Sequence, residues 1–247
     1  MIDKIKVHKY FRRSVPTYGE NAGVQREIAR HLTEMMRSIG LTSFSDALEI
    51  GCGTGILTFL LKHFVSGDIF INDMVKEMCD KCGEDCGIPE RNRIYGDIET
   101  LHITREFDAV FSASVFQWLE DIGKTVETIA CRLRGNGVLA FSTFGPDNMK
   151  ELRKITGRGL IYKSSAELKE ILSSRFEILT AEEGFSTVYF DTPVAVMRHV
   201  LMTGAGGVDG DAGFRLKDFC TDYIHRFGTP RGLPLTYHPL YFVCRKR

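Results

Sequence analysis

The feature that most constrains the fold is an alternation of short apolar runs and amphipathic segments between residues 45 and 143. The apolar runs have the length of buried strands, and they cover residues 46–50, 68–72, 92–96, 106–114 and 137–143. Segments between them, such as residues 119–133, carry apolar residues at helical spacing. Strand–helix units of this kind build an open parallel sheet with helices on both faces. We therefore expect an α/β protein.

Further elements flank this alternating region. A long amphipathic helix is expected over residues 20–40, preceded by a basic segment, and two strands over residues 176–190 and 237–246 bring the sheet to seven strands. Helices at 193–202 and 215–227, with a mobile glycine-rich loop at 204–213 between them, lie outside the repeating unit.

These segments suggest a division of the chain. We expect residues 41–247 to form the main domain, with a helical insertion at about residues 192–230. That insertion and the N-terminal helices of residues 1–40 are expected to form a small lid over the carboxyl ends of the strands. Open α/β sheets bind their ligands at those ends.

Charge and cysteine content narrow the class of protein. Lys plus Arg and Asp plus Glu both number 32, and a net charge of zero argues against a dedicated nucleic-acid binder. No apolar run is long enough to cross a membrane, and the first residues lack the apolar stretch of a secretory signal. Seven cysteines fit reduced thiols better than a disulfide framework. We expect a cytoplasmic protein.

Three of the cysteines, Cys79, Cys82 and Cys86, lie close enough in sequence to suggest a metal site. Their spacing also places them on one face of a helix, together with Val75. A closed zinc site needs four ligands, and no fourth ligand accompanies them. We therefore expect packing residues and no metal.

A glycine-rich stretch, LEIGCGTG, follows the first predicted strand at residues 48–55. It lacks the lysine of a phosphate-binding loop. It also departs from the dinucleotide fingerprint, because Ile56 stands where the third glycine of that motif allows close helix packing. An acid, Glu49, ends the preceding strand. Two more acids, Asp73 and Asp97, follow the second and third strands, at the same edge of the sheet.

This pattern resembles class I S-adenosyl-L-methionine (AdoMet) dependent methyltransferases, which have a Rossmann-like fold. The resemblance implies that Glu49 and the glycine loop approach the methionine part and ribose of AdoMet. The loop glycines are Gly51, Gly53 and Gly55.

The other cofactor contacts follow from the same resemblance. Asp73 is implied to accept the ribose hydroxyls, Asp97 to meet the adenine amino group, and Ile98 to pack on the adenine ring. Ser112 is implied to complete the site after the fourth strand. At the next residue the chain departs from the pattern, because Ala113 stands where related enzymes often carry Asn.

Segments along nearly the whole chain carry a more specific resemblance. Residues 11–29, 112–122, 141–153, 192–204 and 233–246 together are similar to the malonyl-[acyl-carrier protein] O-methyltransferase family of biotin synthesis. The implied reaction esterifies the free carboxylate of a malonyl thioester on acyl-carrier protein, with AdoMet as methyl donor and no metal. A carboxylate is already a nucleophile, so the reaction depends mostly on positioning.

The resemblance also implies roles for substrate residues. Tyr18 and Arg198 are expected to position the carboxylate, while Gln117, Trp118 and Phe144 line the pocket. The implied carrier protein is acidic, and two basic clusters are candidate docking surfaces. The first comprises Lys4, Lys6, Lys9, Arg12 and Arg13, and the second comprises Lys150, Arg153, Lys154 and Arg158.

Two alternative functions remain open from the sequence. The chain could methylate a free small carboxylic acid of the aconitate type, which needs no carrier protein. It could instead be a non-catalytic carrier-binding adaptor that retains AdoMet. A nicotinamide oxidoreductase is disfavoured by Ile56.

Overall fold

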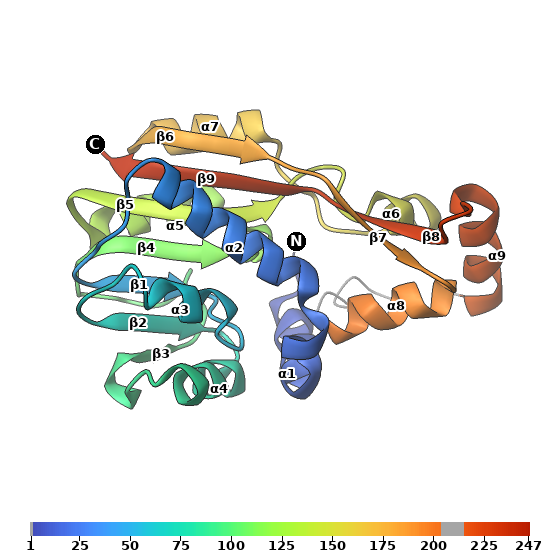
Figure 1. Cartoon of the computed structure of the whole chain (residues 1–247), viewed down its shortest axis with the longest axis horizontal. Coiled ribbons are helices and arrows are strands. Elements are labelled where there is room, and N and C mark those ends of the chain that lie inside the picture. The colour runs from blue at the N-terminus through green and yellow to red at the C-terminus, as the bar shows by residue number, and fades with distance from the viewer. Residues whose placement is uncertain (1, 204–214) are drawn as a thin grey trace.

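The computed structural model describes residues 2–203 and 215–247 (Figure 1). Its described part contains a seven-stranded sheet in the order β3-β2-β1-β4-β5-β9-β6. The strands are β1 (Ala47–Ile50), β2 (Ile69–Asp73), β3 (Arg93–Tyr95), β4 (Phe107–Ala113), β5 (Leu133–Phe144), β6 (Phe176–Glu183) and β9 (Pro239–Lys246). β9 runs antiparallel to β5 and β6, and the other neighbours are parallel. The predicted mostly parallel sheet is confirmed.

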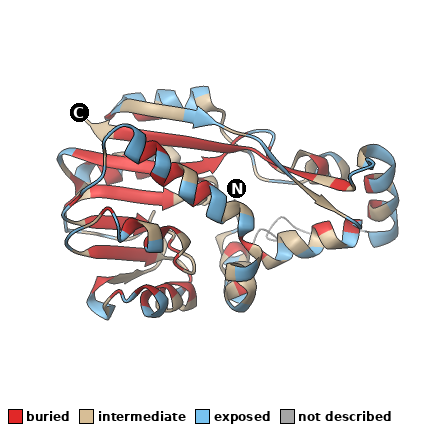
Figure 2. Ribbon diagram, in the orientation of Figure 1, coloured by how far each residue is buried: buried red, intermediate tan, exposed pale blue. Residues whose placement is uncertain are grey.

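Helices cover both faces of this sheet. One face packs against α2 (Gly23–Ser38), α3 (Ile56–Leu61) and α4 (Lys76–Cys86), and the other against α5 (Ile122–Arg132) and α7 (Ser165–Ser173). The alternation along β1 shows the division, because Ala47 joins the first core cluster and Leu48 the second. The strands of the middle of the sheet are buried along most of their length (Figure 2).

The two long strands expected at residues 176–190 and 237–246 are partly wrong. The first is divided at Gly184 and Phe185 into β6 and β7 (Ser186–Phe190), which pairs with β8 (Leu233–Tyr237) in a separate two-stranded sheet. The division falls where β5 ends, so the chain beyond it has no neighbour in the main sheet. His238 marks this point, because it is buried and stacks on Phe185. An apolar pattern cannot show where a neighbouring strand stops.

The N-terminal region also differs from expectation. The helix predicted over residues 20–40 begins at Gly23, and the basic segment before it is itself helical, forming α1 (Lys4–Asn21). Ala22 separates the two helices. The insertion contains the two expected helices, α8 (Pro193–Met202) and α9 (Leu216–Phe227), and the loop expected at 204–213 falls outside the described residues.

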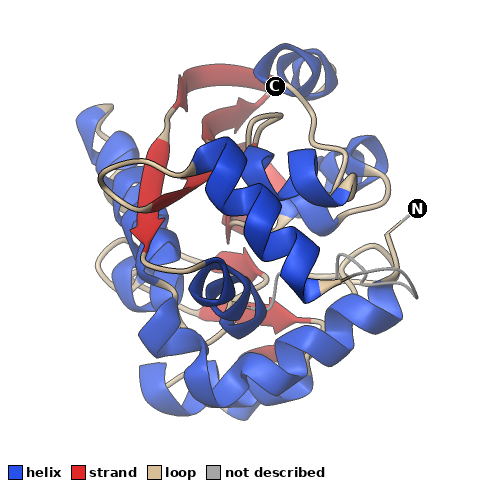
Figure 3. Ribbon diagram, turned by 90° about the vertical axis from the view of Figure 1, so that its right-hand side faces the viewer, coloured by secondary structure: helices blue, strands red, loops and turns tan. Residues whose placement is uncertain are grey.

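α1 packs against α8, and α9 against α6 (Lys150–Thr156). Viewed from the end where the parallel strands finish, helices stand in front of the strands (Figure 3). Within residues 2–203 and 215–247, we find no helix with the length and hydropathy needed to span a membrane.

Candidate functional site

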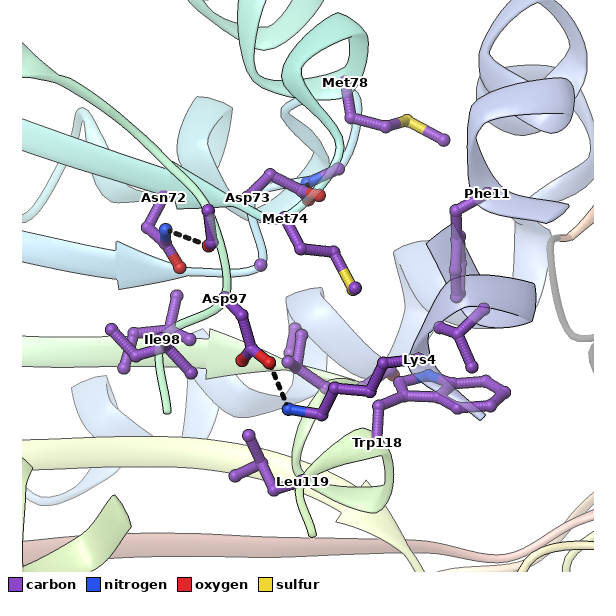
Figure 4. A pocket seen from close by; sticks show the side chains of 18 of the residues that line it. Lys4, Phe11, Asn72, Asp73, Met74, Met78, Asp97, Ile98, Trp118 and Leu119 are labelled. Atoms are coloured by element: carbon purple, nitrogen blue, oxygen red, sulfur yellow. Dashed lines mark hydrogen bonds and ion pairs between the residues drawn. The ribbon is translucent and has the colours of Figure 1, made fainter. Parts of the chain in front are cut away.

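A pocket opens at the carboxyl ends of the parallel strands (Figure 4), and we call it the glycine-loop pocket. Its lining includes Gly51 and Gly53 after β1, Asp73 at the end of β2, and Asp97 and Ile98 after β3. α1 and the segment after β4 complete the wall. The space between the atoms of this pocket amounts to about 680 Å³, which includes solvent at its open mouth.

Two glycines of the loop have different roles. Gly51 has a φ of +69°, and a Cβ there would lie 2.3 Å from Val115 after β4, so only glycine fits. Gly53 faces the pocket, where the nearest atom to a Cβ would be Cε1 of Tyr18, at 3.7 Å. The backbone at Gly53 is thus open to a ligand.

Asp73 fastens this loop from the neighbouring strand. Its carboxylate accepts the N–H of Gly53 at 2.9 Å and the N–H of Val75 at 2.8 Å. Burial nevertheless raises the pKa of Asp73 to about 6, because these two bonds only partly offset the loss of solvent. A buried carboxylate beside an open backbone suits a ligand that brings hydroxyl donors, as the ribose of AdoMet does.

Asp97 and Ile98 also line this pocket, as expected, but Asp97 already has a partner. The ammonium group of Lys4, reaching from α1, lies 2.5 Å from Asp97 and also pairs with Glu99 (Figure 4). The second oxygen of Asp97 accepts the N–H of Glu99 at 3.1 Å. The basic N-terminal segment, expected to form part of the lid and a docking surface, thus also contributes a side chain to the wall of the glycine-loop pocket.

Three expected cofactor residues are not part of the lining of this pocket, and their contact with AdoMet stays a prediction. Glu49 is buried and accepts the hydroxyl of Thr58 at 2.6 Å, and burial raises its pKa. Ser112 donates to the carbonyl of Ile50 at 2.9 Å. Gly55, with a φ of +93°, packs on α4. All three hold the loop in place from beneath, since strand side chains alternate between faces.

A second pocket, which we call the aromatic pocket, adjoins the first. Its lining includes Gln117, Trp118 and Phe144, as expected, together with Tyr162 of the segment after α6 and Tyr237 of β8. The two pockets share four residues. These are Phe11, Tyr18, Ser114 and Trp118. Groups bound in the two pockets would therefore lie on either side of these shared side chains.

Tyr18 occupies the junction, where it was predicted to act. It belongs to α1, with its ring centroid 6.3 Å from that of Phe11, whose ring meets Trp118 edge-on at 5.6 Å. Burial, with a contribution from the charge of Asp73, raises the pKa of the Tyr18 phenol, so its hydroxyl stays protonated. It can therefore donate a hydrogen bond to a ligand.

Arg198 is not brought to either pocket. It is exposed on α8, whose buried residues are Pro193 and Val196 on the other side of the helix. The pairing of Arg198 with a carboxylate stays a prediction that the described geometry does not favour.

Two candidate site residues were not predicted from the sequence. The Ser114 hydroxyl and the Gln25 side-chain oxygen are buried without a hydrogen-bond partner among the described residues, and both residues line the aromatic pocket. Ser114 follows Ala113, the position where the chain departs from the methyltransferase pattern. The sequence analysis pointed to this loop through Ser112, Gln117 and Trp118, but not to Ser114 itself.

The cysteine cluster lies elsewhere. Cys79, Cys82 and Cys86 are buried on the inner face of α4, as the helical spacing predicts. The described part of the chain shows no group of His, Cys, Asp or Glu residues arranged to hold a metal ion.

Known proteins share this architecture. Residues 48–141 match the family model described as a methyltransferase domain. N-methyltransferase NodS from Bradyrhizobium japonicum, in complex with S-adenosyl-L-homocysteine (SAH), has a TM-score of 0.61 at 15% identity, covering 98% of both chains. The DhpI–SAH complex has a TM-score of 0.58 at 19% identity, covering 98% of this chain and 95% of that one. Fold and site thus define a class I AdoMet-dependent methyltransferase.

Curated relatives narrow the class. A malonyl-[acyl-carrier protein] O-methyltransferase from Calditerrivibrio nitroreducens is 34% identical over 96% of this chain and 94% of its own. Another from Haemophilus influenzae is 32% identical over 99% of this chain and 95% of its own. The chain belongs to the malonyl-[acyl-carrier protein] O-methyltransferase family.

Proposed function

We propose that this enzyme transfers a methyl group from AdoMet to the free carboxylate of a malonyl thioester on acyl-carrier protein, an early step of biotin synthesis in the cytoplasm. Full-length similarity to curated relatives of that activity supports the proposal. The observation that carries it is the pair of adjoining pockets that share Tyr18 and Ser114 at the ends of the parallel strands. One pocket suits a nucleoside, and the other suits a small acceptor.

The residues of the glycine-loop pocket fit AdoMet. Gly53 leaves room for a close approach, and Asp73 offers the carboxylate for the ribose. When bound there, AdoMet supplies a methyl group on a sulfonium, which a carboxylate oxygen accepts without any proton transfer. The chain itself then has to orient the acceptor and exclude water.

The lining of the aromatic pocket agrees with this division of work. It contains no Asp, Glu, His, Lys or Arg among the described residues, so no strong general base faces the acceptor. An enzyme that methylates an alcohol needs a group that removes a proton, whereas one that methylates a carboxylate does not. The absence of a base among these residues favours a carboxylic acid as acceptor.

We also propose that α1, α8 and α9 act as the lid. α1 supplies Lys4, Phe11 and Tyr18 to the pocket walls, and Thr203, which directly follows α8, lines the aromatic pocket. Closure of these helices would exclude water from both pockets.

Of the two basic clusters, we propose that the one on and after α6 docks the carrier. Met149 and Leu160, which bracket α6, line the aromatic pocket, so the cluster lies next to the acceptor site. In the N-terminal cluster, Lys4 is paired with Asp97 and Arg12 with Glu77 at 2.7 Å. Lys154 on α6 is exposed, as are Lys9 and Arg13 on α1, so the choice rests on the position of α6 beside the aromatic pocket.

The test is an assay with methyl-labelled AdoMet and malonyl-carrier protein, scored for a base-labile methyl ester. Ester formation on the malonyl carrier, with none on acetyl-carrier protein, is the expected result. Equal activity on free di- or tricarboxylic acids would favour the aconitate-type alternative. Tight carrier binding without methyl transfer to any carboxylate would favour the adaptor.

A further inference from the structure

We propose that the acceptor carboxylate is held by uncharged donors, with the Ser114 hydroxyl at the centre and the Tyr18 hydroxyl beside it, and that no cation of the enzyme pairs with it. This inference rests on the proposed function and specifies how the aromatic pocket recognises its substrate.

The described wall of the aromatic pocket is uncharged. Every described residue that lines the aromatic pocket carries an apolar, aromatic, hydroxyl, amide or thioether side chain. Residues 204–214, which follow Thr203 of the wall in sequence, contain two acids and no Lys or Arg. Arg198 is exposed on α8 outside both pockets. The wall therefore supplies no positive charge to a bound carboxylate.

The backbone of Ser114 is strained. Its φ is +59°, a left-handed conformation that is uncommon for a residue other than glycine and costs free energy. Ser142 holds this conformation, because the Ser114 N–H donates to both the carbonyl and the hydroxyl of Ser142, each at 3.1 Å. Strain of this kind, when it is fixed by neighbouring bonds, often marks a functional position.

Gln117 completes this support. Its side-chain nitrogen donates to the Ser114 carbonyl at 2.5 Å, and its side-chain oxygen accepts the hydroxyl of Thr143 at 3.2 Å. Gln117, which was predicted to line the substrate pocket, lies in the wall of the aromatic pocket. Because both ends of its amide are engaged, we assign it as a positioning residue for Ser114.

Several polar groups at the aromatic pocket lack hydrogen-bond partners among the described residues. The Ser114 hydroxyl is buried and unpaired among the described residues, although it lines both pockets. The buried amide oxygen of Gln25 is unpaired in the same part of the chain, and the described residues provide no hydrogen-bond partner for the Tyr18 hydroxyl. An unmet buried hydroxyl is costly, and a carboxylate that accepts its hydrogen relieves that cost. The Gln25 oxygen is itself an acceptor, so a donor and not a carboxylate would satisfy it.

These observations have a consequence for binding. A carboxylate that enters a pocket without a cation loses solvation that neutral donors only partly replace. Lys4 in the adjoining pocket is already paired with Asp97 and Glu99, so the sulfonium of AdoMet would add a positive charge that those acids do not engage. Acceptor binding should therefore depend on the charge of the occupant. The methyl ester and an acetyl group, being neutral, gain nothing from that charge.

The experiment combines two substitutions at one position. Ser114→Gly removes the hydroxyl and accepts the left-handed backbone, whereas Ser114→Ala removes the hydroxyl and keeps the strain. Both are expected to lower kcat/KM for malonyl-carrier protein at least tenfold, and this loss should exceed any change in the calorimetric Kd for AdoMet, whose pocket Ser114 also lines. Wild-type turnover by Ser114→Gly would overturn the proposal, because the serine would then matter only for its backbone.

Two comparisons address the missing cation. Malonyl-carrier protein should bind at least tenfold more tightly to enzyme holding an AdoMet analogue with an ammonium group in place of the sulfonium than to enzyme holding SAH. Acetyl-carrier protein should not distinguish the two, and equal affinities for the malonyl carrier would overturn the charge argument. Arg198→Ala should change KM less than Ser114→Gly does, and a larger change would assign the carboxylate to Arg198.

Failure of this inference and failure of the proposed function give different results. If the wild-type enzyme forms no ester on malonyl-carrier protein, the proposed function is wrong. If it forms the ester while Ser114→Gly does so equally well, only the assignment of Ser114 is wrong.

Discussion

At the scale of single residues, Asp73 links the fold to the ligand. Its carboxylate accepts two backbone N–H groups and is also placed to accept ribose hydroxyls. Asp73→Ala should therefore weaken AdoMet binding at least tenfold, about 1.4 kcal/mol, as measured by calorimetry. Asp85→Ala is the control, because Asp85 lies on the exposed face of α4 and pairs with Lys81. Unchanged affinity in Asp73→Ala would contradict the assignment.

The raised pKa of Asp73 predicts a pH dependence. Only the ionised carboxylate accepts both ribose hydroxyls, and its pKa in the free protein is about 6. AdoMet affinity should therefore fall as the pH drops below about 6, by up to about tenfold per pH unit. Titration calorimetry between pH 5 and 7 measures this, and Asp73→Asn should bind weakly with a flat profile. A flat profile in the wild-type protein would contradict it.

The raised pKa of Asp73 also affects the stability of the ligand-free fold. Low pH favours that fold, whereas it weakens AdoMet binding. Because the folded pKa lies above the usual value of 3.8, the folded protein binds a proton more tightly than the unfolded chain does. The contribution of Asp73 to stability is therefore greatest at low pH and is lost as the pH rises towards about 6. Ligand binding offsets this loss by pairing the carboxylate.

Site residues could be predicted from the sequence where they belong to a known motif. Gly51, Gly53 and Asp73 follow from the spacing of glycines and acids after successive strands, and they line the pocket. Ser114 could not be predicted, because its left-handed backbone and unpaired hydroxyl depend on contacts with Ser142 and Gln117. Such contacts appear only after the chain has folded.

At the scale of elements, α1 is tied to the edge of the cofactor pocket by one side chain. Lys4 pairs with Asp97 and Glu99 while 21% of its side chain remains exposed. Partly exposed ion pairs contribute roughly 1 kcal/mol or less. Lys4→Gln should thus speed AdoMet release by up to about fivefold in stopped-flow measurements, with Lys9→Gln as the exposed control. Tighter binding in Lys4→Gln would instead mean that Lys4 competes with the ligand for Asp97.

The contact between the glycine loop and α4 predicts a loss of stability. A Cβ at Gly55 would lie 2.7 Å from the sulfur of Cys86, and the φ of +93° is unfavourable for alanine. Gly55→Ala should cost about 2–3 kcal/mol, from backbone strain and overpacking together. Gly87→Ala is a matched control, because its φ is +70° with no atom within 4 Å of a Cβ. A chemical denaturation series should show the larger loss for Gly55→Ala.

The elements themselves were largely predictable, and their ends were not. Apolar runs identified all seven strands of the main sheet, because buried parallel strands are apolar on both faces. The same runs continue through Gly184 and through His238 into β7 and β8, where the partner strand changes. Hydropathy reports burial but does not report which strand lies alongside.

At the scale of the whole molecule, a net charge of zero conceals an uneven distribution. The chain carries equal numbers of acidic and basic residues, yet four basic residues gather on and after α6, beside the aromatic pocket. An acidic carrier would be attracted to that side of the molecule, and its malonyl group would then be near the acceptor site. The separation of docking surface and chemical site makes the two experimentally distinguishable.

Charge reversal on α6 is therefore expected to affect the carrier and not the chemistry. Lys150→Glu with Lys154→Glu should raise KM for malonyl-carrier protein about three- to tenfold and flatten its salt dependence, because rim charges act mainly on encounter. A small malonyl thioester without the carrier should be methylated at the wild-type rate. Lys169→Glu on α7, an exposed lysine on another helix, is the control. A larger effect from reversing Lys9 and Arg13 on α1 would place the docking surface at the N-terminal cluster instead.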